Sequence, residues 1–255
     1  MKKLNLDTIT ACLEGLEETI ILRLIDRAQF KRNKTAYLPG KSGFTGEKQD
    51  SLFDLRVKYQ ERMDALFGRF LVPEERPFSF ELPSPKRKVT LPDKNLYIDD
   101  YNSVNLTAEI KRAYLKLIVK LCPPGDDGQY GSSVEHDVYA LQAISRRIHF
   151  GAMYVAECKY RLNPGVFDQQ IEKNSVDRLL TLLTRPEVES RILLRVVKKV
   201  NKLQKDVNSQ VRNTINPEVV RDFFIKTVIP LTKRGEAIYL INRRKANQSG
   251  VDKKR

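Results

Sequence analysis

The chain has 255 residues, of which 41% are hydrophobic and 31% are charged. This composition can fill a globular core, and no run of about 18 apolar residues is present that could cross a membrane. Three cysteines and two histidines are too few for a disulfide scaffold, and they argue against a zinc site with four ligands at short spacing. The sequence therefore predicts a soluble, cytoplasmic protein with reduced thiols and no metal, although a mature form of a longer precursor stays open.

The formal net charge of +14 is unevenly distributed. Residues 1–140 contain 22 basic and 21 acidic residues, whereas residues 141–255 contain 24 and 11. A basic half of this kind attracts anions such as nucleic acid, anionic lipid or a polyanionic small molecule. The commoner explanation is a solvated, lysine-rich helical surface. Because neither an RNA-binding sheet signature nor a helix-turn-helix pattern is present, nucleic acid is only a weak alternative.

Apolar residues recur every three or four positions along most of the chain, which is typical of amphipathic helices. We expect Asp7 to cap the first helix and Asp50 or Ser51 to cap the second. Pro186 suits a first helical turn, and Pro230 should kink or split the last helix. The expected helices cover residues 6–30, 51–70, 107–121, 133–161, 164–172, 175–183, 187–207 and 217–244.

Five prolines between residues 73 and 92 predict an extended linker without regular structure over about residues 71–104. The basic residues near the end predict a disordered tail over about 245–255. Strand-like alternation is absent. We therefore expect one all-α domain over residues 1–255, a multi-helix bundle, and the long first helix suggests an apolar face shared with a second subunit in a homodimer.

Several charged side chains fall on helices that are otherwise apolar. Arg146 and Arg147 stand between Ile144 and Ile148, so one of the two arginines should point inward, and Lys159 follows on the same helix. Two further pairs are four residues apart and share a helix face: Arg185 with Glu189, and Thr232 with Glu236. Taken alone, each pair is best explained as a surface ion pair or a polar face.

Together these segments resemble the all-helical chorismate mutases of fungal and plant type. The most specific match is residues 141–151 (Leu-Gln-Ala-Ile-Ser-Arg-Arg-Ile-His-Phe-Gly), followed by residues 155–159 (Val-Ala-Glu-Cys-Lys). Weaker matches occur in the same order as in that family, in the first helix over residues 16–30, in the loop at residues 130–132 and in the last helix at residues 229–236. The resemblance covers nearly the whole chain.

The resemblance implies an isomerase that converts chorismate to prephenate in phenylalanine and tyrosine biosynthesis. The reaction is an intramolecular Claisen rearrangement that uses no cofactor, so the protein orients a dianionic substrate and stabilises the charge that grows on its ether oxygen. By the same resemblance, Arg147 binds a carboxylate and Lys159 binds a carboxylate and the ether oxygen. Glu189 accepts a hydrogen bond from the substrate hydroxyl, and Thr232 orients the site. Glu236, when protonated, donates a hydrogen bond to the ether oxygen.

Three departures from the family pattern concern this site. Thr10 occupies the position of an arginine of the first helix, and Arg185 occupies the position of an asparagine. We hypothesise that Arg185 supplies the missing cation and binds substrate. In addition, Arg147 and Lys159 are twelve residues apart instead of eleven. Twelve residues turn an α-helix about 1200°, a third of a turn out of phase, so we expect a single-turn π-bulge within residues 151–154.

The family is also regulated by tyrosine and tryptophan at its dimer interface. Gly131 and Ser132 match the loop that binds the effector backbone, and Arg69 matches one of two effector arginines. The other arginine position is Gly68, and a threonine position beside the effector ring is Glu135. We expect weak, changed or absent regulation.

Two other functions stay open on the sequence alone. Thr10, Arg185 and the extra residue favour a non-catalytic, chorismate-mutase-like binding or regulatory protein. The basic half would suit a helical protein that binds nucleic acid or another polyanion. An assay of chorismate loss separates the first from an active enzyme, and a salt-dependent gel shift tests the second.

Overall fold

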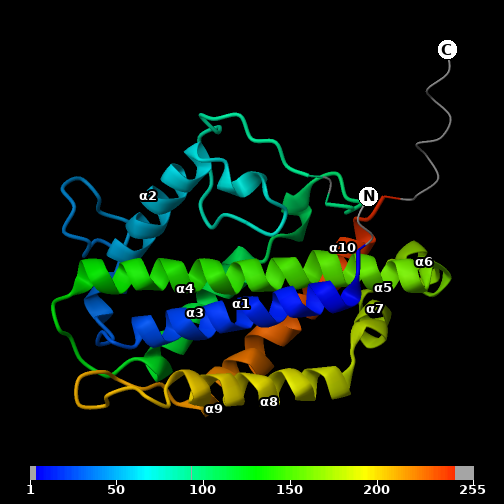
Figure 1. Cartoon of the computed structure of the whole chain (residues 1–255). Coiled ribbons are helices and arrows are strands. Elements are labelled where there is room, and N and C mark those ends of the chain that lie inside the picture. The colour runs from blue at the N-terminus through cyan, green and yellow to red at the C-terminus, as the bar shows by residue number, and fades with distance from the viewer. Residues whose placement is uncertain (1–3, 93, 245–255) are drawn as a thin grey trace.

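A computed structural model describes residues 4–92 and 94–244, and these residues form helices and no strands (Figure 1). An isolated bridge between Ile98 and Arg243 is the one piece of β-type pairing in this part of the chain. The helices are α1 (Leu6–Arg27), α2 (Leu52–Leu66), α3 (Thr107–Leu121), α4 (Tyr130–Phe150), α5 (Ala156–Leu162), α6 (Pro164–Glu172), α7 (Val176–Leu183), α8 (Pro186–Leu203), α9 (Pro217–Phe223) and α10 (Ile229–Ile241). The predicted all-α fold is therefore confirmed.

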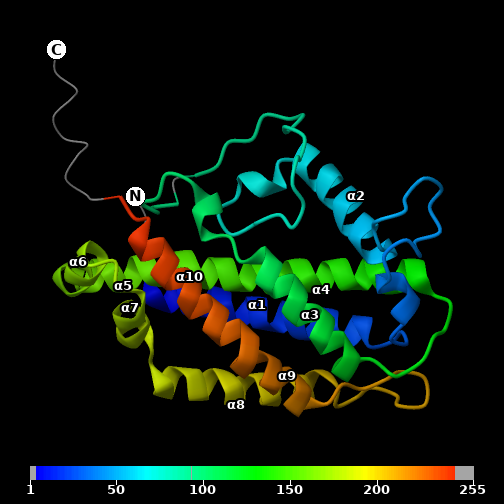
Figure 2. The ribbon, with the colours of Figure 1, turned by 180° about the vertical axis from the view of Figure 1, so that it is seen from behind.

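The long rod formed by α4 and α5 runs the length of the molecule, and the other elements pack around it (Figures 1 and 2). α1 lies along α4, and α8 lies on the far side of α1. α9 and α10 cross this layer diagonally on the same side as α3, whereas α2 covers the opposite edge of α4. Segments 150–162, 183–195 and 229–236 thereby meet near one end of α1.

Several helix ends follow simple capping rules. Ser51 caps α2 through a capping box, in which its hydroxyl accepts from the backbone of Asp54 and the Asp54 carboxylate accepts from the backbone of Ser51. Pro186 opens α8, as predicted. The prediction for the first helix was wrong, because the side chain of Asn5 accepts from the backbone N–H of Asp7 and is the cap. Asp7 lies instead in the first turn, where its negative charge complements the helix dipole.

Two π-helical turns interrupt the helices. The first, Gly151–Val155, joins α4 to α5 without a break and confirms the expected bulge. The second, Phe224–Val228, joins α9 to α10 just before Pro230. Proline has no backbone N–H and its ring clashes with the carbonyl four residues earlier in an α-helix, so a wider turn before Pro230 removes the conflict. The predicted last helix is therefore interrupted by a π-turn that ends two residues before the proline.

A buried ionic cluster fixes α1 against α4. The carboxylate of Asp137 is fully buried and accepts from Arg27 Nε at 2.5 Å, from the Tyr37 hydroxyl at 2.6 Å and from the Tyr114 hydroxyl at 2.7 Å. The other guanidinium nitrogens of Arg27 donate to backbone carbonyls and to Tyr37. Because every partner is satisfied, this charge pair can lie in an otherwise apolar core.

The proline-rich segment contains little regular structure apart from short 3₁₀ turns at Arg69–Leu71 and Tyr101–Val104. It is nevertheless fixed to the helices, since Glu74, Glu75 and Arg76 are buried. The predicted disordered tail, residues 245–255, lies outside the described residues. Among those residues, no helix is long and apolar enough to cross a membrane, and no cluster of potential metal ligands occurs.

Candidate active site

A cavity of about 620 Å³ lies where α1, α5, α8 and α10 converge. Its walls come from segments that are far apart in the sequence, so no local sequence pattern could predict the cavity. Apolar side chains such as Leu13, Val155 and Ile192 alternate with charged ones. The charged and hydroxyl groups that line the cavity are Asp7, Thr10, Glu17, Arg147, Lys159, Arg185, Glu187, Glu189, Arg191, Arg195, Thr232, Lys233 and Glu236.

Arg147 points inward, as the periodicity predicts, whereas Arg146 is exposed. The Arg147 side chain is 3% exposed, and its Nη2 lies 3.2 Å from Oε1 of the fully buried Glu17. Glu17 is held from the other side by Arg195, whose Nε lies 2.9 Å from Glu17 Oε2. Burial lowers the pKa of Arg147 and the Glu17 charge opposes this, so the guanidinium stays charged. The Arg147 Nε has no hydrogen-bond partner within the described chain.

Lys159 and Glu236 meet inside the same cavity. The Lys159 Nζ lies 2.8 Å from Glu236 Oε2 and also donates to the Leu183 carbonyl at 3.0 Å. Burial raises the pKa of Glu236 above its usual value, and the charges of Lys159 and Arg147 oppose that effect. The π-turn between Arg147 and Lys159 restores their phase, so both cations face one space.

Thr232 and Glu189 complete the residues that the sequence singled out. The Thr232 hydroxyl donates to the Val228 carbonyl at 2.7 Å and lies 3.5 Å from Arg147 Nη1. Glu189 is half-buried, and its partner is Lys233 of α10 at 2.9 Å, not Arg185. Lys233 therefore ties α8 to α10 beside the carboxylate.

Arg185 and Arg191 differ from the other cations of the cavity, because neither is paired with a carboxylate within the described chain. Arg185 is the N-cap residue of α8, and within the described chain its guanidinium makes one hydrogen bond, to the carbonyl of Thr184 at 3.4 Å. Thr10, at the position of the family arginine, lines the same cavity from α1. Arg185 and Thr10 thus line the same cavity, and the Arg185 charge is not neutralised by a carboxylate of the described chain.

The charges that line the cavity favour a dianion. Six basic and five acidic side chains face it, which gives a net charge of +1 when all are ionised. Protonation of Glu236, the carboxyl group whose pKa is raised by burial, changes the net charge to +2. A dianionic ligand would balance that charge in a partly buried space.

Comparisons with known proteins identify the family. No family model matches the chain. The chorismate mutase of Schizosaccharomyces pombe is 35% identical over 249 residues, which cover 95% of this chain and 97% of that protein. The solved chorismate mutase of Candida albicans, in complex with L-Trp, matches with a TM-score of 0.85 and 29% identity over 94% of this chain and 92% of that one. A solved relative with tyrosine bound in its allosteric site matches with a TM-score of 0.81 and 33% identity over 94% and 96%.

The chain belongs to the chorismate mutase family. Its activity is the conversion of chorismate to prephenate, a step of aromatic amino acid biosynthesis. Nothing favours the non-catalytic alternative that Thr10 and Arg185 left open, since the similarity extends over nearly the full length of catalytic relatives.

Sequence analysis did not identify three residues that form ion pairs at the site of this chorismate mutase, namely Glu17, Arg195 and Lys233. Glu17 occupies a position on the apolar face of α1, between Leu13 and Ile20. A carboxylate there signals a buried charge that needs a partner. The sequence cannot name that partner, because Arg147 and Arg195 lie 130 and 178 residues away. Lys233, next to Thr232, had no distinguishing signal at all.

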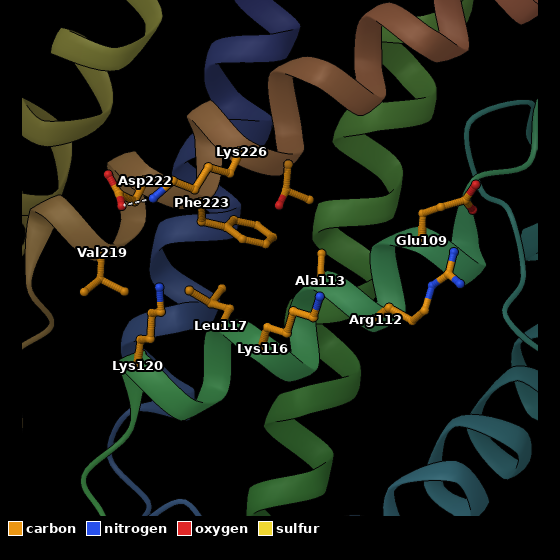
Figure 3. A pocket seen from close by; sticks show the side chains of 11 residues that line it. Glu109, Arg112, Ala113, Lys116, Leu117, Lys120, Val219, Asp222, Phe223 and Lys226 are labelled. Carbon is orange, nitrogen blue, oxygen red and sulfur yellow. Dashed lines mark hydrogen bonds and ion pairs between the residues drawn. The ribbon is translucent and has the colours of Figure 1, made fainter.

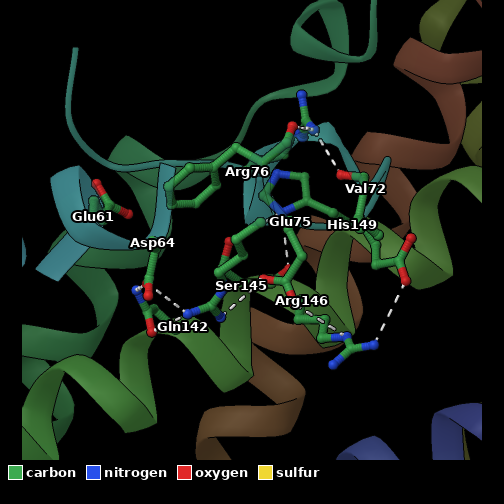
Figure 4. Close-up of polar contacts among 12 residues, drawn as sticks. Glu61, Asp64, Val72, Glu75, Arg76, Gln142, Ser145, Arg146 and His149 are labelled. Carbon is green, nitrogen blue, oxygen red and sulfur yellow. Dashed lines mark hydrogen bonds and ion pairs between the residues drawn. The ribbon is translucent and has the colours of Figure 1, made fainter. Parts of the chain in front are cut away.

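The three candidate effector residues lie in two separate places on this chain. The Arg69 guanidinium donates hydrogen bonds to Asp64 at 2.8 Å, Glu75 at 2.9 Å and Gln142 at 2.6 Å. Figure 4 labels these three partners. Gly131 and Ser132 lie in the first turn of α4. Ten residues separate Ser132 from Gln142, which corresponds to about 15 Å along a helix. Within one chain, Arg69 therefore lies far from Gly131 and Ser132.

Proposed function

We propose that chorismate binds in the cavity between α1, α5, α8 and α10 and is rearranged there by electrostatic preorganisation without a cofactor. The observation that carries this proposal is the convergence of Arg147, Lys159 and Glu236 on one partly buried space whose charge balances a dianion. Arg147 binds a substrate carboxylate, since its side chain lines the cavity and its buried Nε has no hydrogen-bond partner in the described chain. Lys159 binds carboxylate and ether oxygen, and Glu189 accepts from the substrate hydroxyl.

Glu236 acts in its neutral form, as a donor to the ether oxygen where negative charge grows. Burial already favours protonation of this carboxyl group, and a bound dianion favours it further. Fixed donors of this kind are each worth about 3–4 kcal/mol of transition-state stabilisation. Thr232 helps orient the Arg147 guanidinium, since its hydroxyl contacts that group and is itself held by the Val228 carbonyl of the π-turn.

Arg185 supplies the second carboxylate contact that Thr10 cannot make. The support is its position on the cavity wall and the lack of a carboxylate partner in the described chain. The Arg185→Ala variant should raise KM for chorismate about tenfold, the loss of one charged hydrogen bond, with a smaller effect on kcat. Adding Thr10→Arg to that variant should restore KM, because the arginine then comes from the family position.

Steady-state kinetics on purified protein test the assignment. Arg191→Ala is the matched control, since Arg191 lines the same cavity and is equally unpaired with a carboxylate among the described residues. If Arg191→Ala raises KM while Arg185→Ala leaves it unchanged, the role of Arg185 is wrong. If neither variant changes KM, the substrate does not contact the side of the cavity that Arg185 and Arg191 form.

We also propose a cytoplasmic homodimer with weak, changed or absent effector control. Binding of an amino acid effector is supported by the relatives solved with L-Trp and with tyrosine. Changed control is supported by Arg69, whose donors are already occupied, and by Glu135, which pairs with Arg56 at 2.9 Å. Because Arg69 and Gly131 lie apart on one chain, an effector that contacts both would bridge two subunits.

Two measurements test these points. Light scattering at micromolar concentration should give twice the monomer mass, and a monomer mass contradicts the dimer. Tyrosine and tryptophan should change kcat/KM weakly or not at all, whereas strong inhibition by one together with strong activation by the other contradicts the prediction. Fractionation of cells of the source organism tests the location.

A further inference from the structure

A second cavity, of about 540 Å³, lies on the face of the molecule formed by α3 and α9 (Figure 3). It is an open groove. One wall is α3, and the other is α9 with the π-turn that follows it. None of its residues lines the candidate active site or belongs to the effector candidates. The established activity therefore leaves this groove without a role.

A row of cations follows the α3 wall. Arg112, Lys116 and Lys120 are exposed, and each is four residues from the next, so they form one stripe along the helix. None of the three has a hydrogen bond or ion pair to another residue of the described chain. Like charges at this spacing repel one another and destabilise a helix. Figure 3 shows the Lys116 and Lys120 ammonium groups on either side of Leu117, directed into the groove.

Among the described residues, no acidic side chain of the groove forms an ion pair with this stripe, although the Lys120 charge adds to the effect of Lys226 in lowering the pKa of Asp222. Glu109 is paired with Arg234 at 2.9 Å, outside the groove, and Asp222 is paired with Lys226 at 2.6 Å on the opposite wall. The floor between the walls is apolar, formed by Ala113, Leu117, Val219 and Phe223. A ligand that fits must carry negative charges along one side and apolar groups along its centre.

We propose that this groove binds an acidic amphipathic helix of a partner protein. The helical rise of 1.5 Å per residue places the three cations about 6 Å apart, over about 12 Å. A helix with carboxylates at every fourth position presents the same repeat, and its neighbouring apolar side chains meet Leu117 and Phe223. Nucleic acid offers phosphates but no apolar row for the floor, so it is the weaker occupant.

Fluorescence anisotropy on the full chain tests the proposal with a designed probe. The probe is a fluorescein-labelled peptide of about 18 residues, long enough for several helical turns, with glutamate at every fourth position and leucine on the adjacent face. Lys116→Glu/Lys120→Glu reverses the stripe and should weaken binding at least about tenfold, while chorismate turnover stays normal. Lys198→Glu/Lys202→Glu, a matched pair four residues apart on α8 outside the groove, should leave peptide binding unchanged.

Each other outcome overturns the proposal. If the wild-type chain does not bind the peptide at low salt, the groove is not a docking site for such a helix. Equal weakening by both double variants means that only the overall charge matters. If a peptide with serine in place of leucine binds equally well, the apolar floor does not contribute and the occupant is not an amphipathic helix. The same conclusion follows if a single-stranded oligonucleotide binds more tightly than the peptide and the Lys116→Glu/Lys120→Glu variant no longer binds it.

Discussion

The protonation state of Glu236 governs how the enzyme should respond to pH. This side chain is 5% exposed, its Oε2 lies 2.8 Å from Lys159 Nζ, and burial raises its pKa. Only the neutral carboxyl group can donate to the ether oxygen of the substrate. As pH rises through the raised pKa the donor is lost, and above it the protonated fraction falls tenfold for each pH unit.

The Glu236→Gln variant separates this role from a structural one. Its amide has nearly the same shape and donates at every pH, so the fall in kcat/KM with rising pH should become flat. The Glu236→Ala variant removes the donor and should lower kcat about 10²–10³-fold, equivalent to about 2.7–4 kcal/mol. Both variants should keep the helical circular dichroism of the wild type.

The assay follows the loss of chorismate absorbance from about pH 5 to 9, the range in which a raised carboxyl pKa becomes visible. Glu189→Gln is the control, because Glu189 faces the same cavity but, in the proposed mechanism, accepts a hydrogen bond from the substrate hydroxyl. That variant should lose activity at every pH and keep the slope. If Glu236→Gln keeps the wild-type slope, Glu236 is not the titrating donor.

Two further substitutions test the packing behind the site and the core. Gly151→Ala places a Cβ 2.7 Å from Thr232 Cγ2 and 3.2 Å from Arg147 Nη1, so these two side chains must move. Displacement of the Arg147 guanidinium should lower kcat/KM about 10- to 100-fold in the chorismate assay. An unchanged kcat/KM contradicts this close packing. Asp137→Ala leaves the buried Arg27 charge uncompensated and should lower the free energy of unfolding by about 3–5 kcal/mol in urea, whereas the surface control Glu218→Ala should change it by less than about 1 kcal/mol.

The parts of the fold that follow from chain-local rules could be predicted from the sequence. Helix positions follow from apolar periodicity, and the break near Pro230 follows from the missing N–H of proline. The π-turn at Gly151–Val155 was predictable because the family resemblance assigns Arg147 and Lys159 to one ligand, and counting residues then shows that a regular helix would put them out of phase. The cap at Asn5 was missed because two neighbouring side chains, Asn5 and Asp7, can both cap a helix, and only the backbone geometry decides between them.

The pairings across the site could not be predicted in the same way. Glu17 joins Arg147 and Arg195, and Lys233 pairs with Glu189, because helices that are distant in the chain pack together. Periodicity shows which face of a helix is buried, but not which residue of another helix lies opposite. The resemblance to a known family supplied the roles of Lys159, Glu236 and Glu189, and the structure shows that these residues line one cavity.

Deletion of Ala152 is the sharpest test of the π-turn. The deletion reduces the Arg147–Lys159 spacing to eleven residues, which turn a regular α-helix about 1100°, only 20° beyond three full turns. Both cations should still face the cavity without a bulge, so the shortened enzyme should keep its activity within about tenfold. Insertion of one alanine after Ala152 adds about 100° of rotation, directs Lys159 away from Glu236, and should lower kcat about 100-fold or more. Circular dichroism and urea unfolding show whether each variant is folded. If a folded deletion variant is inactive while the insertion variant is active, the π-turn does not serve to align these two side chains.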